Sequence, residues 1–262
     1  MLRAEIDMIF HFFGTSDKGR YRRHNEDRFV CNPKEKLFLV ADGIGGQASG
    51  EIASEMAIDC VEEFVVRSRQ EDITWPIPYR EELSIELNRL LAGATLANHK
   101  IRALANQHPS MRGMGTTLVG GIIEKDHLAI INVGDSRLYR IRAGQMEQIT
   151  QDHTLVGLQE SMGLLTKEEA SNHPQRHILT SALGIEAIDN INVDLFPRKI
   201  LKKDIYLICS DGLHDMLGDI EILETIESNR GKSLENIARS LIDQANLAGG
   251  RDNITVVLLS FK

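Results

Sequence analysis

Apolar residues in the N-terminal part of the chain change from short strand-like runs to a helical spacing. From Gly50 onward, apolar residues recur at three- and four-residue steps, which predicts a helix with one face on a core. A loop over 74–80 separates it from a second predicted helix over 81–106. Before these helices, brief apolar runs that end at turn residues predict strands over 8–17, 27–32 and 36–42.

The second half of the chain is rich in predicted strands. A hairpin is expected over 137–150, with its turn near Ala143 and Gly144. A helix is expected over 233–249, where apolar residues again follow helical spacing. Further strands are expected over 117–124, 127–135, 191–197, 204–212 and 253–261. Strands that come in blocks, rather than in alternation with helices, favour an α+β domain in which helices cover antiparallel sheets.

The composition is that of a globular protein with a single domain of 262 residues. A formal charge of −8 disfavours nucleic acid and anionic membranes as partners, unless a local patch compensates. The 3 cysteines are far apart and have apolar neighbours, which argues against disulfides and a zinc site and favours a reducing cytoplasm. The opening residues do not resemble a signal peptide, and no apolar run has membrane-spanning length.

Four aspartates occupy the same position relative to a predicted strand. Asp42 and Asp211 end apolar runs and precede glycine, Asp135 follows "LAIINVG", and Asp252 comes just before the last strand. A single such residue is usually part of a turn. Four of them, mounted on neighbouring strand ends, can converge in one pocket, where their mutual repulsion favours a bound cation.

The ligand types indicate which metal this pocket would hold. Carboxylates, glycine carbonyls and water are hard oxygen donors that suit magnesium or manganese, and both metals accept the same ligands. Gly43, Gly45, Gly46 and Gly212 would let the backbone approach an ion or anion. Two ions, roughly 3.5 to 4 Å apart, could activate a water for in-line attack on a phosphoryl group. The glycine-rich segment lacks the lysine of a nucleotide-binding phosphate loop.

The segment "DKGRYRRHNEDRF" offers a cationic anchor for phosphate. Arg22 and Arg23 lie here, with Asp27 close behind them. The planar guanidinium of arginine can hold two phosphoryl oxygens at once. A solvated basic turn is the alternative interpretation of the same residues.

These segments, taken together and in order, resemble the metal-dependent protein phosphatases of the 2C type, in their compact bacterial branch. The similarity extends over nearly the whole chain and is more specific than any one motif. The motifs that carry it are "SDKGRYRRHNED", "VADGIGG", "GMGTTLVGG", "VGDSRLYR", "ITQDHTLV", "HPQRHILTSALG", "SDGLHD" and "GGRDNITVV".

The resemblance implies a four-layer α-β-β-α sandwich with two central antiparallel sheets, formed by one domain over residues 1–262, with a mobile flap near 166–177. It also implies a dinuclear manganese or magnesium site at one end. The family's roles carry over by position: Asp42, the Gly43 carbonyl, Asp211 and Asp252 hold the ions, and Asp27 supports the first through water. Asp135 with Asp211 binds a possible third ion, and Arg22 clamps the substrate phosphate.

The activity implied is hydrolysis of phosphoserine and phosphothreonine in proteins, by in-line attack of a metal-bridging hydroxide. Such an enzyme would oppose a serine/threonine kinase, and we expect a cytoplasmic monomer whose partners are phosphorylated proteins and that kinase. One alternative is a catalytically idle regulatory module that binds phosphoproteins. Another is a hydrolase of small phosphate esters, which would use the same chemistry. A phosphatase with a nucleophilic aspartate is excluded, because the second residue after Asp42 is Ile44 rather than an acid.

The chain differs from some members of this family in the residue that could donate a proton to the leaving alkoxide. Those members have a histidine within or just after the glycine-rich segment. Ile44 and Gln47 occupy the corresponding places, and neither can donate a proton by titration. A metal-bound water is the preferred donor, and His153, His173 and His177 are alternatives. His214 is expected to be structural. Small hydroxyl residues are expected to satisfy backbone groups in the loops, namely Thr116, Thr117 and Ser136.

Overall fold

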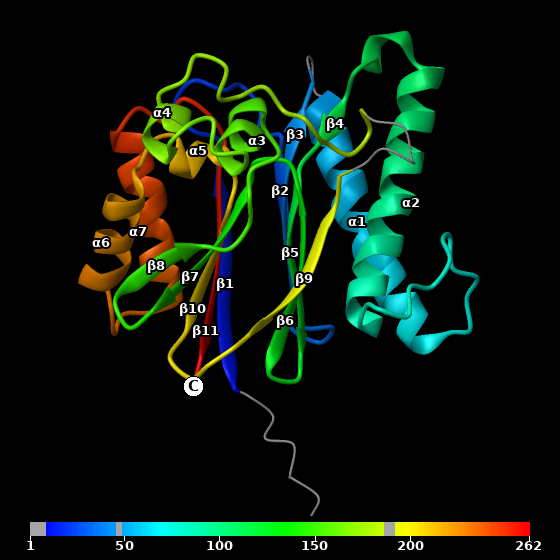
Figure 1. Ribbon diagram of the computed structural model, residues 1–262, viewed down its shortest axis with the longest axis horizontal. Coiled ribbons are helices and arrows are strands. Elements are labelled where there is room, and N and C mark those ends of the chain that lie inside the picture. Colours follow the sequence, from blue (N-terminus) through cyan, green and yellow to red (C-terminus); the bar gives the residue numbers. More distant parts are fainter. Residues whose placement is uncertain (1–8, 46–48, 186–191) are drawn as a thin grey trace, which may run out of the picture.

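Two antiparallel sheets lie face to face between two layers of helices (Figure 1). The computed structural model describes residues 9–45, 49–185 and 192–262. The first sheet has the order β1-β11-β10-β7-β8. Its strands are β1 (Phe10–Asp17), β7 (Arg137–Arg142), β8 (Gln145–Gln148), β10 (Ile205–Cys209) and β11 (Ile254–Phe261).

The second sheet has the order β2-β3-β5-β6-β9, and the short strand β4 pairs with the end of β3. Its strands are β2 (Asp27–Asn32), β3 (Leu37–Ile44), β4 (Gly115–Thr116), β5 (Leu118–Glu124), β6 (His127–Val133) and β9 (Asp194–Lys199). Neighbouring strands in both sheets run antiparallel.

The helices form the two outer layers of the sandwich. The pair α1 (Ser49–Gln70) and α2 (Ile85–Gln107) covers the second sheet, and α6 (Asp219–Ser228) and α7 (Leu234–Leu247) cover the first (Figure 1). Shorter helical segments lie nearer the upper end of the view: α3 (Leu155–Ser161), α4 (Lys167–Ser171), α5 (Asp211–His214) and the 3-10 turn η1 (Pro109–Met111). The predicted α+β sandwich with two central antiparallel sheets is confirmed.

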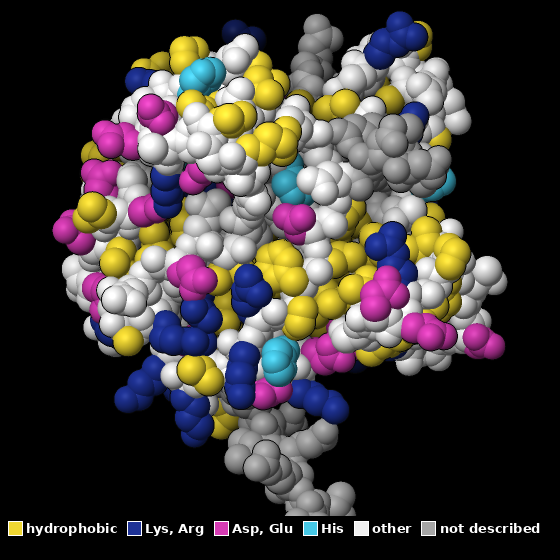
Figure 2. Space-filling model, viewed as in Figure 1, with side chains coloured by type: hydrophobic (Ala, Val, Ile, Leu, Met, Phe, Trp, Pro, Cys, Tyr) yellow, Lys and Arg dark blue, Asp and Glu magenta, His cyan; other side chains and the backbone are white. Residues whose placement is uncertain are grey.

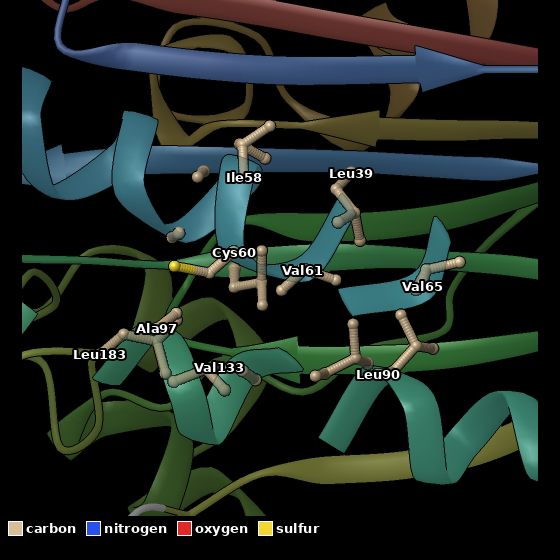
Figure 3. Close-up of a cluster of buried hydrophobic side chains, with 14 of the residues drawn as sticks. Leu39, Ile58, Cys60, Val61, Val65, Leu90, Ala97, Val133 and Leu183 are labelled. Atoms are coloured by element: carbon tan, nitrogen blue, oxygen red, sulfur yellow. The ribbon is translucent and has the colours of Figure 1, made fainter. Parts of the chain in front are cut away.

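The position of β3 between two buried layers explains why its sequence is a continuous apolar run. Leu39 and Ala41 pack toward α1 and α2, in the cluster that Figure 3 shows, whereas Phe38 and Val40 pack between the two sheets. Both faces of β3 are therefore buried. Asp42 is the first polar residue after this buried run, so its place at the end of the strand follows from the layers.

The hairpin turn and the start of α2 show how local sequence sets the boundaries. Ala143 and Gly144 both have positive φ, 51° and 77°, as a two-residue hairpin turn requires. The second helix begins at Ile85 rather than at residue 81, because the Ser84 side chain accepts a hydrogen bond from the Leu87 amide and caps it. The sequence pattern did not reveal α6, in which only Ile222 and Ile226 are buried.

Candidate active site

The aspartates at the strand ends converge on one cleft at the end of the sandwich. The cleft has a volume of about 460 Å³. Six of the residues predicted for the site line it: Arg22, Asp42, Gly43, Asp135, Asp211 and Asp252. The seventh, Asp27, lies on β2 directly opposite Asp42 on β3 in the register of the second sheet.

Asp27 is held below the cleft by two hydroxyl groups. Its side chain is buried, with 2% of the residue exposed, and Oδ2 accepts hydrogen bonds from Ser210 Oγ at 2.7 Å and Thr255 Oγ1 at 2.6 Å. Its other oxygen, Oδ1, is buried and has no hydrogen-bond partner. Burial raises the pKa of Asp27 to about 6. A buried carboxylate oxygen without a hydrogen-bond donor is an unsatisfied acceptor, which a cation could coordinate.

The backbone of Asp42 is fixed by the hydroxyl residues that follow α2. Thr117 Oγ1 accepts a hydrogen bond from the Asp42 amide at 2.9 Å, and Thr116 Oγ1 donates to the Asp42 carbonyl at 2.9 Å. Thr117 Oγ1 also lies 2.8 Å from Ser136 Oγ, beside Asp135. The prediction that these hydroxyls satisfy backbone groups is confirmed for Thr116 and Thr117, whereas the Ser136 hydroxyl contacts the side chain of Thr117.

Gly43 and Gly212 are required by close backbone packing. A Cβ atom at Gly43 would lie 2.1 Å from the carbonyl oxygen of Gly50 at the start of α1, and one at Gly212 would lie 2.0 Å from that of Asn253. Real Cβ atoms do not approach so closely, so these glycines let β3 and α5 sit against their neighbours. Gly46 and Gln47 fall outside the described residues.

Asp211 and Asp135 face each other from the two sheets. Asp211 is the first residue of α5, directly after β10, and its Oδ1 is buried without a hydrogen-bond partner. Burial raises the pKa of Asp135 to about 7. His214 Nε2 donates to the Asp135 carbonyl at 3.1 Å, which agrees with the structural role expected for this histidine.

The electrostatics of the cleft favour a cation. The pKa of Asp42 is raised well above its usual value by burial and then by Asp27, Asp211 and other carboxylates. The pKa of Asp211 is raised well above its usual value by burial, with Asp135 and Asp252 adding to the effect. Among the described residues, the buried carboxylates of Asp27, Asp42 and Asp211 have no ion-pair partner, and Asp27 and Asp211 each keep an unpartnered oxygen. Oxygen donors of this kind fit manganese or magnesium.

Arg22 reaches the cleft from the loop between β1 and β2. Its Nη2 atom lies 2.6 Å from Asp252 Oδ2. The loop is tied down by Asn253, which accepts from the Glu26 amide at 2.8 Å and donates to the carbonyls of Lys18 and His24 at 2.9 and 3.0 Å. The sequence analysis missed Asn253, although it follows Asp252 directly in "GGRDN".

The chain around residues 176–179 supplies cleft residues, of which sequence reasoning named only His177, as a possible proton donor. Arg176 and Leu179 line the cleft, as does His177, whose Nδ1 lies 3.4 Å from Asp215 Oδ2. Ligand atoms of His177, Asp211 and Asp215 lie within 4.8 Å of one another. Asp215, four residues after Asp211, faces the cleft because α5 makes one helical turn between them, which the spacing alone could have suggested.

The three histidines that were candidates for proton donation differ in whether they line the cleft. His153 is buried, and its ring contacts Asp194 Oδ2 at 3.0 Å and the Gly134 amide at 3.3 Å. It therefore joins the loop after β8 to the loop after β6 and the start of β9, rather than facing the cleft. His173 accepts a hydrogen bond from the Gln175 amide and is not among the lining residues. His177 is the candidate that lines the cleft.

The fold and the site together define a hydrolase class in which carboxylates at one end of a double-sheet sandwich bind divalent metal. The protein phosphatase 2C family model matches residues 19–240. The serine/threonine phosphatase stp of Listeria innocua is 38% identical over 247 residues, which are 93% of each chain. The chain therefore belongs to the protein phosphatase 2C family.

Solved structures agree with this assignment. The serine/threonine phosphatase PstP/Ppp of Mycobacterium tuberculosis superposes with a TM-score of 0.82 at 33% identity, covering 97% of this chain and 99% of that one. The catalytic domain of PstP in complex with two manganese ions has a TM-score of 0.80 at 31% identity, covering 97% and 99% of the respective chains. Among the described residues, none of the helices is long and apolar enough to cross a membrane.

Proposed function

We propose that this protein is a manganese-dependent phosphatase that hydrolyses phosphoserine and phosphothreonine in proteins. The observation that carries the proposal is the convergence of Asp27, Asp42, Asp135, Asp211 and Asp252 at one cleft of a protein phosphatase 2C fold. The degenerate regulatory module, which was the first alternative, would be expected to have lost metal-binding acids. This chain keeps the full set.

Two ions would be held by Asp42, the Gly43 carbonyl, Asp211 and Asp252, with Asp27 supporting the first of them. When bound, such ions supply an activated water for in-line attack and neutralise charge on the phosphoryl group. Magnesium could replace manganese, since both prefer oxygen ligands. Asp135 and Asp211 are the residues we assign to a third ion.

Side chains of the protein have three proposed roles in this reaction: they position the metal-binding carboxylates, bind the substrate phosphate and cover the substrate. The hydroxyls of Thr116 and Thr117 hold the backbone of Asp42, and Ser210 and Thr255 hold the carboxylate of Asp27. Arg22 places a planar cation at the rim for the substrate phosphate. The segment 166–177 contributes its last residues to the cleft wall, and we assign it the role of a flap over the substrate.

The proposed setting is a signalling pair with a serine/threonine kinase, in which this protein acts as a cytoplasmic monomer on the phosphoproteins that the kinase produces. Nucleic acid is not a partner in this proposal, because the chain has a formal charge of −8. The assignment of residues 1–262 to one phosphatase domain is supported by the core that both sheets share.

Phosphate release from a phosphothreonine peptide tests the substrate class. We expect release with manganese, none with excess chelator, and a higher kcat/KM for the peptide than for p-nitrophenyl phosphate, because a peptide can also contact cleft residues such as Arg176 and Leu179. A preference for the small ester would favour the ester-hydrolase alternative. A folded protein that releases phosphate from neither substrate would favour the regulatory module.

Replacement of Arg22 tests the phosphate anchor. We expect Arg22→Ala to lower kcat/KM for the peptide by about 10- to 100-fold, mainly through KM, because charge-assisted hydrogen bonds to phosphate are lost. Arg23→Ala is the matched control, since Arg23 is the next residue and does not line the cleft. Equal effects of the two substitutions would mean that the segment acts only as a solvated basic turn.

A further inference from the structure

A second pocket lies at the end of the sandwich opposite the cleft. It has a volume of about 600 Å³ and is formed where β7 and β11 end, β10 begins and the chain turns after β9. The strand β11 begins two residues after Asp252 at the cleft and ends at Phe261 in this pocket. At about 3.3 Å per residue, β11 alone spans about 23 Å between the two sites. The two pockets are therefore separate sites that, among the described residues, share no lining residue.

Positive charge dominates this pocket in a chain that is acidic overall. Its wall contains four cationic side chains, Arg142, Lys202, Lys203 and Arg230, against the single carboxylate of Asp204. Figure 2 shows Lys and Arg side chains gathered at the lower end of the molecule, around the position of the C-terminus in Figure 1. The repulsion of anions that the formal charge of −8 implies does not hold at this end.

The one carboxylate is already neutralised inside the protein. Asp204 is fully buried, and its two oxygens accept hydrogen bonds from Nε and Nη2 of Arg142, each at 2.6 Å. Oδ2 also accepts from the Leu201 amide at 2.8 Å. Asp204 and Arg142 thus form an ion pair within the wall of the pocket. Of the other cations, Arg230 pairs with Glu227 at 3.0 Å, whereas Lys202 and Lys203 face the pocket without a carboxylate partner among the described residues.

The two lysines are presented by a rigid turn. Lys203 adopts a positive φ of 71°, and its amide donates to the Phe261 carbonyl at 2.8 Å. The Phe261 amide in turn donates to the Asp204 carbonyl at 3.1 Å. Lys202 and Lys203 are exposed, and the described part of the chain gives neither an ion-pair partner. Fixed backbone beneath unpaired ammonium groups lowers the entropic penalty of binding an anion.

We propose that this basic pocket binds a phosphate group, at a site separate from the catalytic cleft and independent of the proposed activity. Two unpaired lysines beside Arg230 suit an anion with two negative charges and several acceptor oxygens, which a single carboxylate does not provide. The volume of the pocket leaves room for the molecule that carries the phosphate. The phosphate can belong to a free phosphate ester or to the headgroup of an anionic lipid. In the second case the cleft, at the other end, faces away from the lipid surface and stays open to substrate.

The test uses the full chain loaded with manganese and the double variant Lys202→Ala/Lys203→Asn. Asparagine is chosen at position 203 because it tolerates positive φ. Inorganic phosphate is titrated calorimetrically, and binding to vesicles is measured by sedimentation with and without an anionic phospholipid. Lys34→Ala/Lys100→Ala is the control, since it removes the same charge from exposed lysines outside the pocket.

We expect the pocket variant to lose one phosphate-binding event, with affinity for that site at least about tenfold weaker, while kcat/KM for p-nitrophenyl phosphate is unchanged. If the ligand is a headgroup, vesicle binding falls about 30-fold in the pocket variant and little in the control. Loss of phosphate binding without any vesicle binding assigns the site to free phosphate esters. Wild-type protein that binds phosphate only at the cleft and ignores anionic vesicles, or a pocket variant that matches the control in both assays, overturns the proposal.

Discussion

Asp211→Ala is expected to reduce manganese-dependent phosphate release by at least about a thousandfold, because it removes a carboxylate that would hold an ion at the cleft. Asp42→Ala should have an effect of the same size for the same reason. Neither change should unfold the protein, since each removes a group whose charged form is destabilised by burial and by neighbouring carboxylates. The measurement is the initial rate on a phosphothreonine peptide at saturating manganese.

The control for both substitutions is Asp243→Ala, which removes one carboxylate from the exposed face of α7. Its rate should equal that of the wild type. Circular dichroism and thermal unfolding verify that each variant is folded. An Asp211→Ala protein that is folded and retains its rate would exclude this residue as a metal ligand.

Without metal, the stability of the protein is expected to fall as the pH rises from about 4 to about 7. Burial raises the pKa of Asp27 from 3.8 to about 6 and that of Asp135 from 3.8 to about 7. Between the unfolded and folded pKa values, the folded state binds more protons than the unfolded state, so stability is lost as these groups ionise. For Asp27 alone the change is about 3 kcal/mol.

Urea unfolding at several pH values, with chelator and with manganese, measures this effect. Manganese should flatten the pH dependence and raise stability near pH 7, because bound cations neutralise the carboxylates and bind only the folded state. Asp42→Asn should stabilise the chelated protein near neutral pH, whereas Asp243→Asn should not. A metal-free protein whose stability increases with pH over this range would show that the carboxylates already have countercharges.

Helices and strands could be predicted from the sequence where burial of one or both faces produces a regular pattern of apolar residues. The runs at β2 and β3 and the helical spacing of α1 and α7 were recognised because one or both faces are buried. The exposed, acid-rich helix α6 buries only two residues, so its pattern was too weak to recognise. The start of α2 depended on a cap at Ser84, which spacing alone does not locate.

The site was predictable where one residue both ends a strand and carries the chemistry. Asp42, Asp135, Asp211 and Asp252 were found in this way, and the structure brings them to one cleft. Arg176 and Asp215 were not assigned to it, and His177 was named only as an alternative proton donor, because the loop that carries Arg176 and His177 has no regular pattern. Their place depends on how the segment after α4 folds back over α5.

The sequence by itself determined the layered α+β architecture, the family and the acidic residues of the site, because strand ends and apolar periodicity are local properties. Only the tertiary structure decided which of these groups meet. It placed Asp27 opposite Asp42 through strand register, gave the hydroxyls of Ser210 and Thr255 to Asp27, and left His177 alone among the candidate histidines at the cleft. It also gathered Arg142, Lys202, Lys203 and Arg230 at the far end. Contacts between residues distant along the chain are set by packing, which no local pattern encodes.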